Sequence, residues 1–431
     1  MKQHQKMLLG IVIGTVVGIA ANVLAGSLPS LKPGLDWVVT NITGLVGQLF
    51  LRALLMLVVP LLFSALVMGV CELDLKQLGR LGLRTMGYTV VISSIAVLIG
   101  LVLVNTLKPG VGLSDEARAL AMKGTSVQAA PAPSSTSVPS LIAAMVPSNP
   151  LKAAADGDMI ALIVFSLIFG LGLALTDTPA ARHLRETIQG LHDVMMKLID
   201  GVLKLAPIGV AALLFSMMAR LGMGVLMQVA SYVGVVLLAL GLHMFVVYSL
   251  SVRFLGGRNP VAFFRDCRLA IVTAFSTASS SATLPTALKV AEENLKLPRN
   301  VARFVLTAGS AMNQNGTALF EGVTVLFLAQ VFGVQLSLPD QAVVMFICVL
   351  AGIGTAGVPA GSIPVIAMIL GMFKIPPEGL ALVLGVDRFL DMCRTTLNVT
   401  GDLAAAVYVS RGEPNVEAEH DTRLETRSSA S

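Results

Sequence analysis

Polar side chains follow a regular spacing in one stretch near the C-terminal end of the chain, DRFLDMCRTTLNVTGD. They are separated by three or four residues, or by sums of these steps, so on an α-helix they would share one face. These side chains belong to Asp387, Asp391, Arg394, Thr395, Asn398 and Asp402. A planar guanidinium binds a carboxylate through two hydrogen bonds, and a carboxylate attracts an ammonium group. The stripe could therefore bind a zwitterion, whereas the simpler alternative is a buried ion pair between Asp391 and Arg394.

The surroundings of this stripe are apolar. Of the 431 residues, 55% are hydrophobic and 13% are charged, and the mean hydropathy is +0.82, whereas roughly 25% of the residues of a soluble chain are charged. This composition indicates a polytopic membrane protein, in which a charge at membrane depth costs on the order of 3 kcal/mol and usually serves function. The formal net charge of +5 does not indicate nucleic-acid binding, because the basic residues are spread over short loops, as the positive-inside rule expects. Four scattered cysteines predict neither a metal site nor a disulfide framework.

Plain apolar spans precede the last third of the chain. We expect them at about 7–26, 45–70, 85–107, 159–175, 195–221 and 226–252. The first span is long for a signal peptide and is read as a retained helix. We expect a multi-pass protein of a bacterial inner membrane with both termini in the cytoplasm, and the loop arginines and lysines on that side. A Pro/Ser-rich segment, 108–158, is expected to be flexible and external, and the polar tail 411–431 to be cytoplasmic without a fold of its own.

The pattern changes after residue 258, where two units of similar architecture follow each other. Each has an apolar, hairpin-sized segment interrupted by small residues, AFSTASSSATLPTA in the first and AGIGTAGVPAGSIPVIA in the second. Each then has a helix that polar residues are expected to break, through NQNGT in the first unit and through the polar stripe in the second. Broken helices at matching positions of two halves indicate a transporter binding site near the bilayer midplane. Free N–H groups at Ser279 to Ser281 and at the tip 357–361 suit carboxylates, and the free carbonyls of NQNGT suit sodium.

These motifs carry a family resemblance. SSSATLP, NQNGT, GTAGVPAG and DMCRTTLNVTGD, in this order and over nearly the whole chain, resemble the dicarboxylate/amino acid:cation symporter family. The resemblance implies an all-α fold of eight transmembrane helices and two re-entrant hairpins, built from inverted repeats and assembled as a homotrimer. It implies a scaffold domain of 1–70 and 159–221, and a transport domain of 85–107 and 226–410 that moves as an elevator.

The resemblance also implies a substrate site. Arg394 would bind a side-chain carboxylate and Asp391 an ammonium group, while Asn398 and Thr395 would hold the main-chain groups. Ser280, Thr317 and the backbone at Val358 would complete this pocket. Because both the arginine and the aspartate are present, the resemblance favours an acidic amino acid, glutamate or aspartate. A carrier of C4-dicarboxylates or neutral amino acids remains the alternative.

Three cation sites are implied, and they differ in how well this sequence keeps them. The first, with Gly309, Asn313, Asn398 and Asp402, is intact, and its oxygen ligands suit a hard cation. The second, largely the carbonyls of Gly352, Ile353 and Thr355, has Ala311 where the family usually has threonine. The third is eroded, because its aspartate is Asn315 and its helix 3 positions hold Thr89, Ile92 and Ser93. A neutral amide cannot balance a buried sodium ion as a carboxylate does, so we expect one sodium of the usual set to be absent.

Two further departures concern protons and selectivity. Glu321 takes the position of the proton-carrying glutamate of the family's animal members, and an apolar environment favours the protonated form of such a group. A glutamate that only hydrogen-bonds inside the bundle is the alternative. The arginine that shields the aspartate in relatives is missing, since its two usual positions hold Ala278 and Met392. Arg388 could replace it only by reaching across nearly one turn.

Other classes of protein fit less well. A serine hydrolase in the membrane would need a base near Ser279 to Ser281, but we expect all five histidines, including His243, to lie outside the polar core. A passive channel would not need partners for both an ammonium group and a carboxylate. The sequence thus predicts a non-enzymatic symporter without a cofactor, whose partners are a small amino acid, co-transported Na⁺ or H⁺, and the bilayer.

Overall fold

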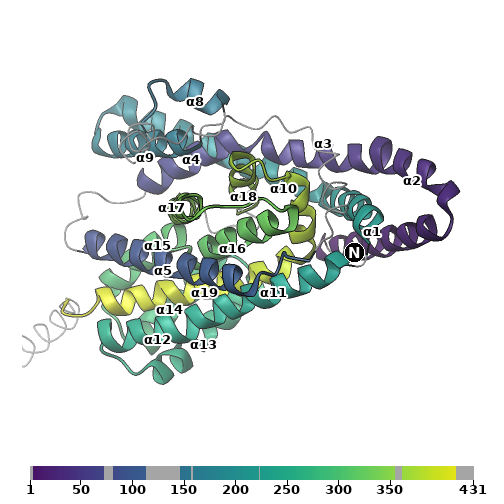
Figure 1. Ribbon diagram of the computed structural model, residues 1–431. Helices are drawn as coiled ribbons and strands as arrows, with labels where there is room; N and C mark the ends of the chain where they lie inside the picture. Colours follow the sequence, from purple (N-terminus) through teal and green to yellow (C-terminus); the bar gives the residue numbers. More distant parts are fainter. Residues whose placement is uncertain are drawn as a thin grey trace, which may run out of the picture.

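The computed structural model describes residues 3–71, 81–112, 146–156, 159–222, 224–354 and 362–413. Every regular element in these ranges is helical (Figure 1). The helices before residue 223 are α1 (Gln3–Ser27), η1 (Pro29–Leu31), α2 (Lys32–Val38), η2 (Val39–Thr43), α3 (Gly44–Leu55), α4 (Val58–Cys71), α5 (Leu83–Leu107), α8 (Pro150–Asp156), α9 (Met159–Leu175) and α10 (Pro179–Leu221).

The second half of the chain contributes the remaining helices. They are α11 (Gly224–Leu242), η4 (His243–Val247), α12 (Tyr248–Leu250), η5 (Ser251–Leu255), α13 (Pro260–Thr277), α14 (Ser280–Lys289), η6 (Val290–Asn294), α15 (Arg299–Met312), α16 (Asn315–Phe332), α17 (Leu338–Gly354), α18 (Ser362–Met372), η7 (Pro377–Gly379) and α19 (Leu380–Val409). In Figure 1, α5, α11, α13, α14 and α19 form one side of the molecule, α4, α8 and α9 form the opposite side, and α15 to α18 lie between them.

Helix α1 packs along α10 through a row of glycines. Gly10, Gly14 and Gly18 are four residues apart, so they share one face of the helix. A Cβ atom added at any of them would come between 2.3 and 2.8 Å from a backbone oxygen of α10. Small residues at this spacing let two helix backbones approach closely in a membrane, and here they join the first expected span to the fifth.

Most expected spans correspond to helices with similar bounds. The spans 85–107 and 159–175 are α5 and α9, and 226–252 is a helix that continues through the π-helical turns η4 and η5. The span 45–70 is interrupted between α3 and α4, and α10 begins well before residue 195. The short helices α2 and α8 had no signal in the apolar pattern.

Several helices are suited to crossing a membrane. Within the described ranges, four helical segments are long and apolar enough, namely Leu9–Ser27, Leu83–Leu107, Leu226–Leu255 and Arg299–Phe332. A fifth is added if the two halves of α10, which are bent by 52°, count as one span. Shorter apolar helices accompany them within α4, α9 and α17. This is the architecture of a multi-pass helical membrane protein.

The two repeated units differ in where their helices break. In the first, α13 ends where Ala278 adopts a left-handed conformation with φ of 48°, and Ser279 caps α14 by accepting a hydrogen bond from the Ala282 amide at 3.2 Å. The expected break in NQNGT is confirmed, because Asn313 and Gln314 separate α15 from α16. The expected break at the polar stripe is wrong, since α19 runs without interruption. Neighbouring helices can supply hydrogen-bond partners for side chains at this spacing, so the backbone hydrogen bonds of α19 need not be broken.

Candidate functional site

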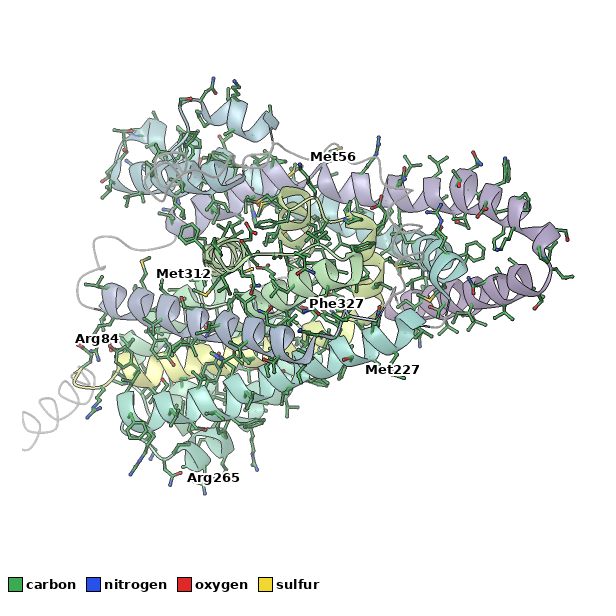
Figure 2. The ribbon with its side chains drawn as sticks, viewed as in Figure 1. Met56, Arg84, Met227, Arg265, Met312 and Phe327 are labelled. Atoms are coloured by element: carbon green, nitrogen blue, oxygen red, sulfur yellow. The ribbon has the colours of Figure 1, made fainter. Side chains whose placement is uncertain are left out.

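Helix α19 lies among α11, α13, α14, α15 and α16, and its polar stripe is buried between them. Glycines allow the close approach. A Cβ at Gly316 of α16 would come within 2.8 Å of the Arg394 carbonyl oxygen, and one at Gly401 within 2.3 Å of the Tyr248 hydroxyl. In Figure 2, the side chains of Met312 and Phe327 point into the helix bundle, whereas those of Met227 and Arg265 lie outside it. The stripe faces protein rather than lipid, as its spacing predicts.

A buried guanidinium lies between two carboxylates at the centre of the stripe. Arg394 Nε donates to Asp391 Oδ1 at 2.9 Å, and Arg394 Nη1 is 3.1 Å from Asp387 Oδ1. Its Cζ atom lies 4.2 Å from the centre of the Phe320 ring, and its side chain is only 2% exposed. The ion pair that the sequence left open as the simpler alternative is therefore present. Arg388 reaches across the turn to within 3.7 Å of Asp391 Oδ2, as the missing shielding arginine would require.

A network of amides lies one turn further along α19. Asn398 Nδ2 donates to Gln314 Oε1 at 2.5 Å and to Thr317 Oγ1 at 3.2 Å, and Asn398 Oδ1 accepts from the Gly316 amide at 2.7 Å. These residues connect the middle of α19 to the break between α15 and α16. The sequence predicted Asn398 and Thr317 as site residues but gave the side chain of Gln314 no role. A polar side chain at a helix break was a signal that Gln314 could contribute to the site, but its partner Asn398 could be found only from the packing of the helices.

The first predicted cation site is assembled around Asp402. Asn313 Nδ2 donates to Asp402 Oδ1 at 3.0 Å, and a Cβ at Gly309 would lie 2.6 Å from the same oxygen. Asn313 Oδ1 is buried and has no hydrogen-bond partner among the described residues. A carboxylate beside a free carbonyl oxygen is a suitable donor set for a hard cation. Asn398 shares this helix face, but its amide is used by Gln314, Thr317 and Gly316.

At the eroded third site, the predicted residues meet in a different hydrogen-bond network. Ser93 donates to Asn315 Oδ1, Asn315 Nδ2 donates to the Tyr248 hydroxyl at 3.0 Å, and that hydroxyl donates to the Leu397 carbonyl at 3.2 Å. Asn315 thus uses both ends of its amide within the protein. The Thr89 hydroxyl is buried and has no hydrogen-bond partner among the described residues. Ile92 is buried and apolar.

His243 lies closer to this network than the sequence predicted. Its ring is fully buried and meets the Tyr248 ring edge to face, with 4.8 Å between the ring centres. The expectation that it lies outside the polar core was wrong. Apolar neighbours along the chain made it resemble a residue of a plain span. Neither ring nitrogen has a hydrogen-bond partner in the part of the chain that the structure describes.

Glu321 is fully buried on α16, one turn after Thr317. Neither carboxyl oxygen has a hydrogen-bond partner among the described residues. Burying a carboxyl group without hydrogen-bond partners is costly. The alternative of a glutamate that hydrogen-bonds inside the bundle finds no support among these residues.

The remaining predicted residues are placed to different degrees. Ser280 begins α14 and is buried, as is Thr395 on α19. Gly352 lies against the helix break, where a Cβ atom would be 3.5 Å from the Gln314 carbonyl oxygen. Ile353 continues the last turn of α17. Thr355 and Val358 lie outside the described residues, as do the side chain of Ala311 and the whole tip 357–361.

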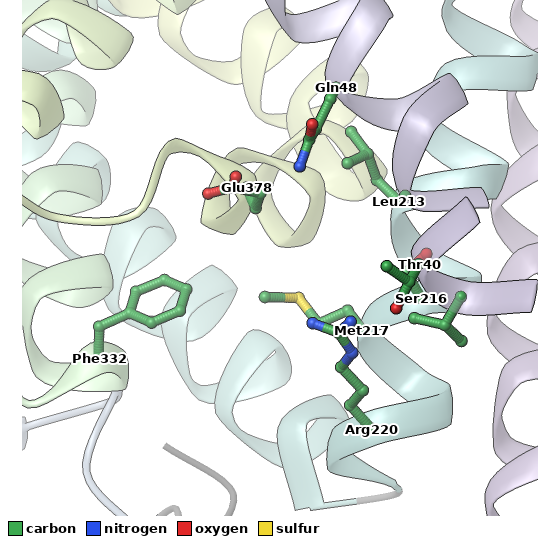
Figure 3. Close-up of a pocket in the computed structure, with 10 residues that line it drawn as sticks. Thr40, Gln48, Leu213, Ser216, Met217, Arg220, Phe332 and Glu378 are labelled. Carbon is green, nitrogen blue, oxygen red and sulfur yellow. The ribbon is translucent and has the colours of Figure 1, made fainter. Parts of the chain in front are cut away.

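A cavity of about 100 Å³ lies away from the polar stripe. Figure 3 shows Gln48, Leu213, Met217 and Arg220 on one side of it, and Phe332 and Glu378 on the other. It separates α3 and α10 from the end of α16 and from η7. The cavity is therefore not the site formed by the stripe.

Comparison with known proteins identifies the family. The model of the sodium:dicarboxylate symporter family matches residues 4–412, so the chain belongs to this family. A proton/sodium-glutamate symport protein of Bacillus subtilis (strain 168) is 31% identical over 404 residues, which are 94% of this chain and 92% of that protein. A proton/glutamate-aspartate symporter of Escherichia coli (strain K12) is 34% identical over 381 residues, covering 88% and 87% of the two chains. A C4-dicarboxylate transport protein of Rhodospirillum rubrum is 29% identical over 94% of this chain and 89% of its own.

Proposed function

We propose that this protein is a secondary active symporter that takes up an acidic amino acid, glutamate or aspartate, together with Na⁺, H⁺ or both. The observation that carries the proposal is the buried Arg394 between Asp391 and Asp387. Relatives that are named as glutamate and glutamate-aspartate symporters support the substrate class. No cofactor is required for this activity, and the family is one of transporters rather than enzymes.

Binding would exchange one ion pair for two. The substrate side-chain carboxylate would pair with Arg394, and the released Asp391 would pair with the substrate ammonium group. Each member of the Arg394–Asp391 pair would then have a new partner of opposite charge on the substrate, which limits the desolvation cost of binding. Thr317, Asn398 and Thr395 would hold the main-chain groups, and Ser280 and the backbone at Val358 would close the pocket through their N–H groups.

Coupling would use the carboxylate and amide oxygens of the first cation site. Asp402 with Asn313 and the carbonyl of Gly309 would bind sodium, and a second sodium would bind the carbonyls of Gly352, Ile353 and Thr355. The third site would be lost, because Asn315 is neutral and already bonded to Ser93 and Tyr248. Glu321 would carry a proton.

The movement would be that of an elevator with eight spans and two re-entrant hairpins. Helices of 1–70 and 159–221 would form a fixed scaffold of a homotrimer, and those of 85–107 and 226–410 a transport domain. Within each proposed domain the helices pack closely, as α1 does on α10 and α19 does among α11, α13, α14, α15 and α16. Both termini would lie in the cytoplasm and the protein in an inner membrane.

A carrier of C4-dicarboxylates is the second candidate, because one relative bears that name. Asp391 argues against it, since a dicarboxylate would bring a second negative charge beside this residue. Uptake of labelled L-glutamate and L-aspartate into proteoliposomes tests both candidates, with an inward sodium gradient or an inward proton gradient in sodium-free buffer. We expect unlabelled acidic amino acids to compete and succinate or serine not to. Competition by succinate with none by glutamate would overturn the proposal.

A further inference from the structure

Two groups of opposite charge face each other across the cavity that lies away from the polar stripe. Arg220, in the last turn of α10, lines one side of it, and Glu378, in η7, lines the other (Figure 3). They are the one cation and the one carboxyl group among the described residues that line this cavity. Burial raises the pKa of the Glu378 carboxyl, and the positive charge of Arg220 opposes this rise. The two groups therefore interact electrostatically across the cavity.

Glu378 lacks part of its hydrogen bonding within the protein. Its Oε2 atom is buried and has no hydrogen-bond partner among the described residues, and leaving such an acceptor without a partner is costly. The Ser216 hydroxyl, which also lines the cavity, is already engaged with Thr43 Oγ1 at 2.7 Å and donates to the Ala212 carbonyl at 2.9 Å. A donor inside the cavity, from water or from a bound molecule, would supply the missing partner.

The size and the other walls of the cavity suit a small molecule with an apolar part. A water molecule needs about 10 to 15 Å³ of such a volume, so a cavity of about 100 Å³ has room for about seven waters. This room is enough for an amino acid of moderate size. Buried apolar side chains complete the walls, namely those of Leu213, Met217 and Phe332. They would favour an apolar side chain over a polar one.

A neutral amino acid carries the two charges that this cavity can pair. Its carboxylate would accept hydrogen bonds from the planar guanidinium of Arg220, and its ammonium group would donate to Glu378. Pairing both charges limits the cost of removing them from water. Glutamate or aspartate would bring a third charge, for which the described lining residues offer no second cation. The cavity therefore disfavours the acidic amino acids proposed for the stripe.

We propose that this cavity is a second amino-acid site, which binds a neutral, zwitterionic amino acid with an apolar side chain between Arg220 and Glu378. The bound molecule would link α10 to η7, which belong to the proposed scaffold and transport domains. It would therefore hold the two domains together and slow uptake without competing at the stripe. Binding does not require the proposed symport function, whereas this effect on uptake rests on it.

The probe for the test is L-leucine, and its binding is measured as a rise in the Tm of the purified full-length protein, with and without excess L-glutamate. Two analogues each lack one charge, because isocaproate has no ammonium group and isoamylamine has no carboxylate. Arg220→Met and Glu378→Gln each remove one partner from the protein. Their charge-matched controls are Arg265→Met and Glu293→Gln, whose side chains are 73% and 64% exposed and do not line the cavity.

We expect L-leucine at about ten times its Kd to raise Tm by about 2 °C, equally with and without glutamate. Neither analogue should raise Tm at the same concentration. The Kd for leucine should rise at least about tenfold in Arg220→Met and in Glu378→Gln, since each loses a hydrogen bond to a charged group. The two control variants should keep the wild-type Kd. In uptake assays, leucine should lower the kcat for L-glutamate and leave its KM unchanged.

Several results would overturn the inference. No rise in Tm would mean that the cavity holds water only, and an unchanged Kd in both Arg220→Met and Glu378→Gln would place leucine outside it. A rise that excess glutamate abolishes, or a raised KM for glutamate, would place leucine at the stripe. Binding without a fall in kcat would contradict the link between α10 and η7.

Failure of the proposed function would look different. A wild-type protein that takes up no acidic amino acid would refute that function, while the rise in Tm with leucine would still support the second site. If one of the two cavity variants does not fold, the other variant and the analogues still test the same pairing, because each removes one charge from it.

Discussion

Arg394 and Asp391 are three residues apart on α19 and are joined by a hydrogen bond of 2.9 Å between Nε and Oδ1. The pair is buried, and Asp387 approaches the same guanidinium from the turn before. Removing one member of such a cluster leaves an uncompensated buried charge. The geometry therefore predicts that the arginine is needed both for the fold and for an anionic substrate.

Arg394→Leu should abolish uptake of acidic amino acids and lower the free energy of unfolding by about 3 kcal/mol. The reason is that Asp387 loses its buried cation and Asp391 keeps only the exposed Arg388 as a partner. The matched control is Arg388→Leu, whose side chain is 49% exposed and lies 3.7 Å from Asp391, and which should change KM by no more than about threefold. Uptake assays together with thermal unfolding of the purified variants measure both effects. Acidic amino acid uptake by Arg394→Leu at the wild-type rate would contradict the assigned role.

Gly309→Ala tests the proposed cation site by steric means. The added methyl group would lie 2.6 Å from Asp402 Oδ1, so the carboxylate must move away from Asn313. We expect the half-saturating sodium concentration to rise about tenfold, the equivalent of about 1.4 kcal/mol. Gly87→Ala is the control, because nothing lies within 4 Å of its added Cβ atom. Equal sodium dependence of the two variants would place the cation elsewhere.

Asn315→Asp should restore a charge at the third predicted cation site. The Ser93 hydroxyl can still donate to the new carboxylate, and the Tyr248 hydroxyl can turn to donate to it as well. We expect the Hill coefficient for sodium in uptake assays to rise above that of the wild type, since a buried carboxylate can balance one more cation. The control is Asp340→Asn at the exposed start of α17, which should leave the coefficient unchanged. A wild-type coefficient in Asn315→Asp would mean that charge alone does not recreate the site.

The sequence predicted those parts of the site that depend on local pattern. The spacing of the polar residues from Asp387 to Asp402 predicted a helix with one polar face. The run of polar residues that begins at Asn313 predicted the helix break. Both predictions follow from backbone geometry. Three features depend on which helices meet and could not be predicted. They are the bond from Asn398 to Gln314, the bond from Asn315 to Tyr248, and the burial of His243. The prediction of a break in α19 was wrong because neighbouring helices supply partners for its polar side chains, so the hydrogen bonds of its backbone stay intact.

Gly14→Ala tests the joint between α1 and α10. The added Cβ would be 2.4 Å from the Ala211 carbonyl oxygen, and a backbone atom cannot move aside as a flexible side chain can. Overpacking of this kind costs about 1 to 3 kcal/mol, so we expect a lower Tm and less protein in the membrane. Gly26→Ala on the same helix is the control, since its added Cβ meets nothing within 4 Å. An unchanged Tm for Gly14→Ala would show that α1 can be displaced from α10 at little cost.

Glu378 gives a prediction about pH at the cavity between α10 and η7. Burial raises the pKa of the Glu378 carboxyl above its ordinary value, and the positive charge of Arg220 opposes this rise only in part. A carboxyl whose pKa is raised in the folded state contributes stability at low pH, below its pKa in the unfolded chain, and loses it as the pH rises through the folded-state pKa. One of its oxygens, Oε2, has no hydrogen-bond partner among the described residues.

Glu378→Gln should therefore be about as stable as the wild type at pH 4 and more stable at pH 8, because the amide does not ionise. Thermal unfolding of both proteins between these pH values measures the difference. Arg220→Met removes the charge that opposes the effect of burial on Glu378. At pH 8, Glu378→Gln should therefore raise Tm more in the Arg220→Met protein than in the wild type. Gln48 and Met217 line the same cavity without a charge, and Arg220 is the one cation among the described residues that line it. A Tm difference that does not vary with pH would mean that Glu378 keeps the same protonation in the folded and unfolded chain, and that Arg220 offsets its burial completely.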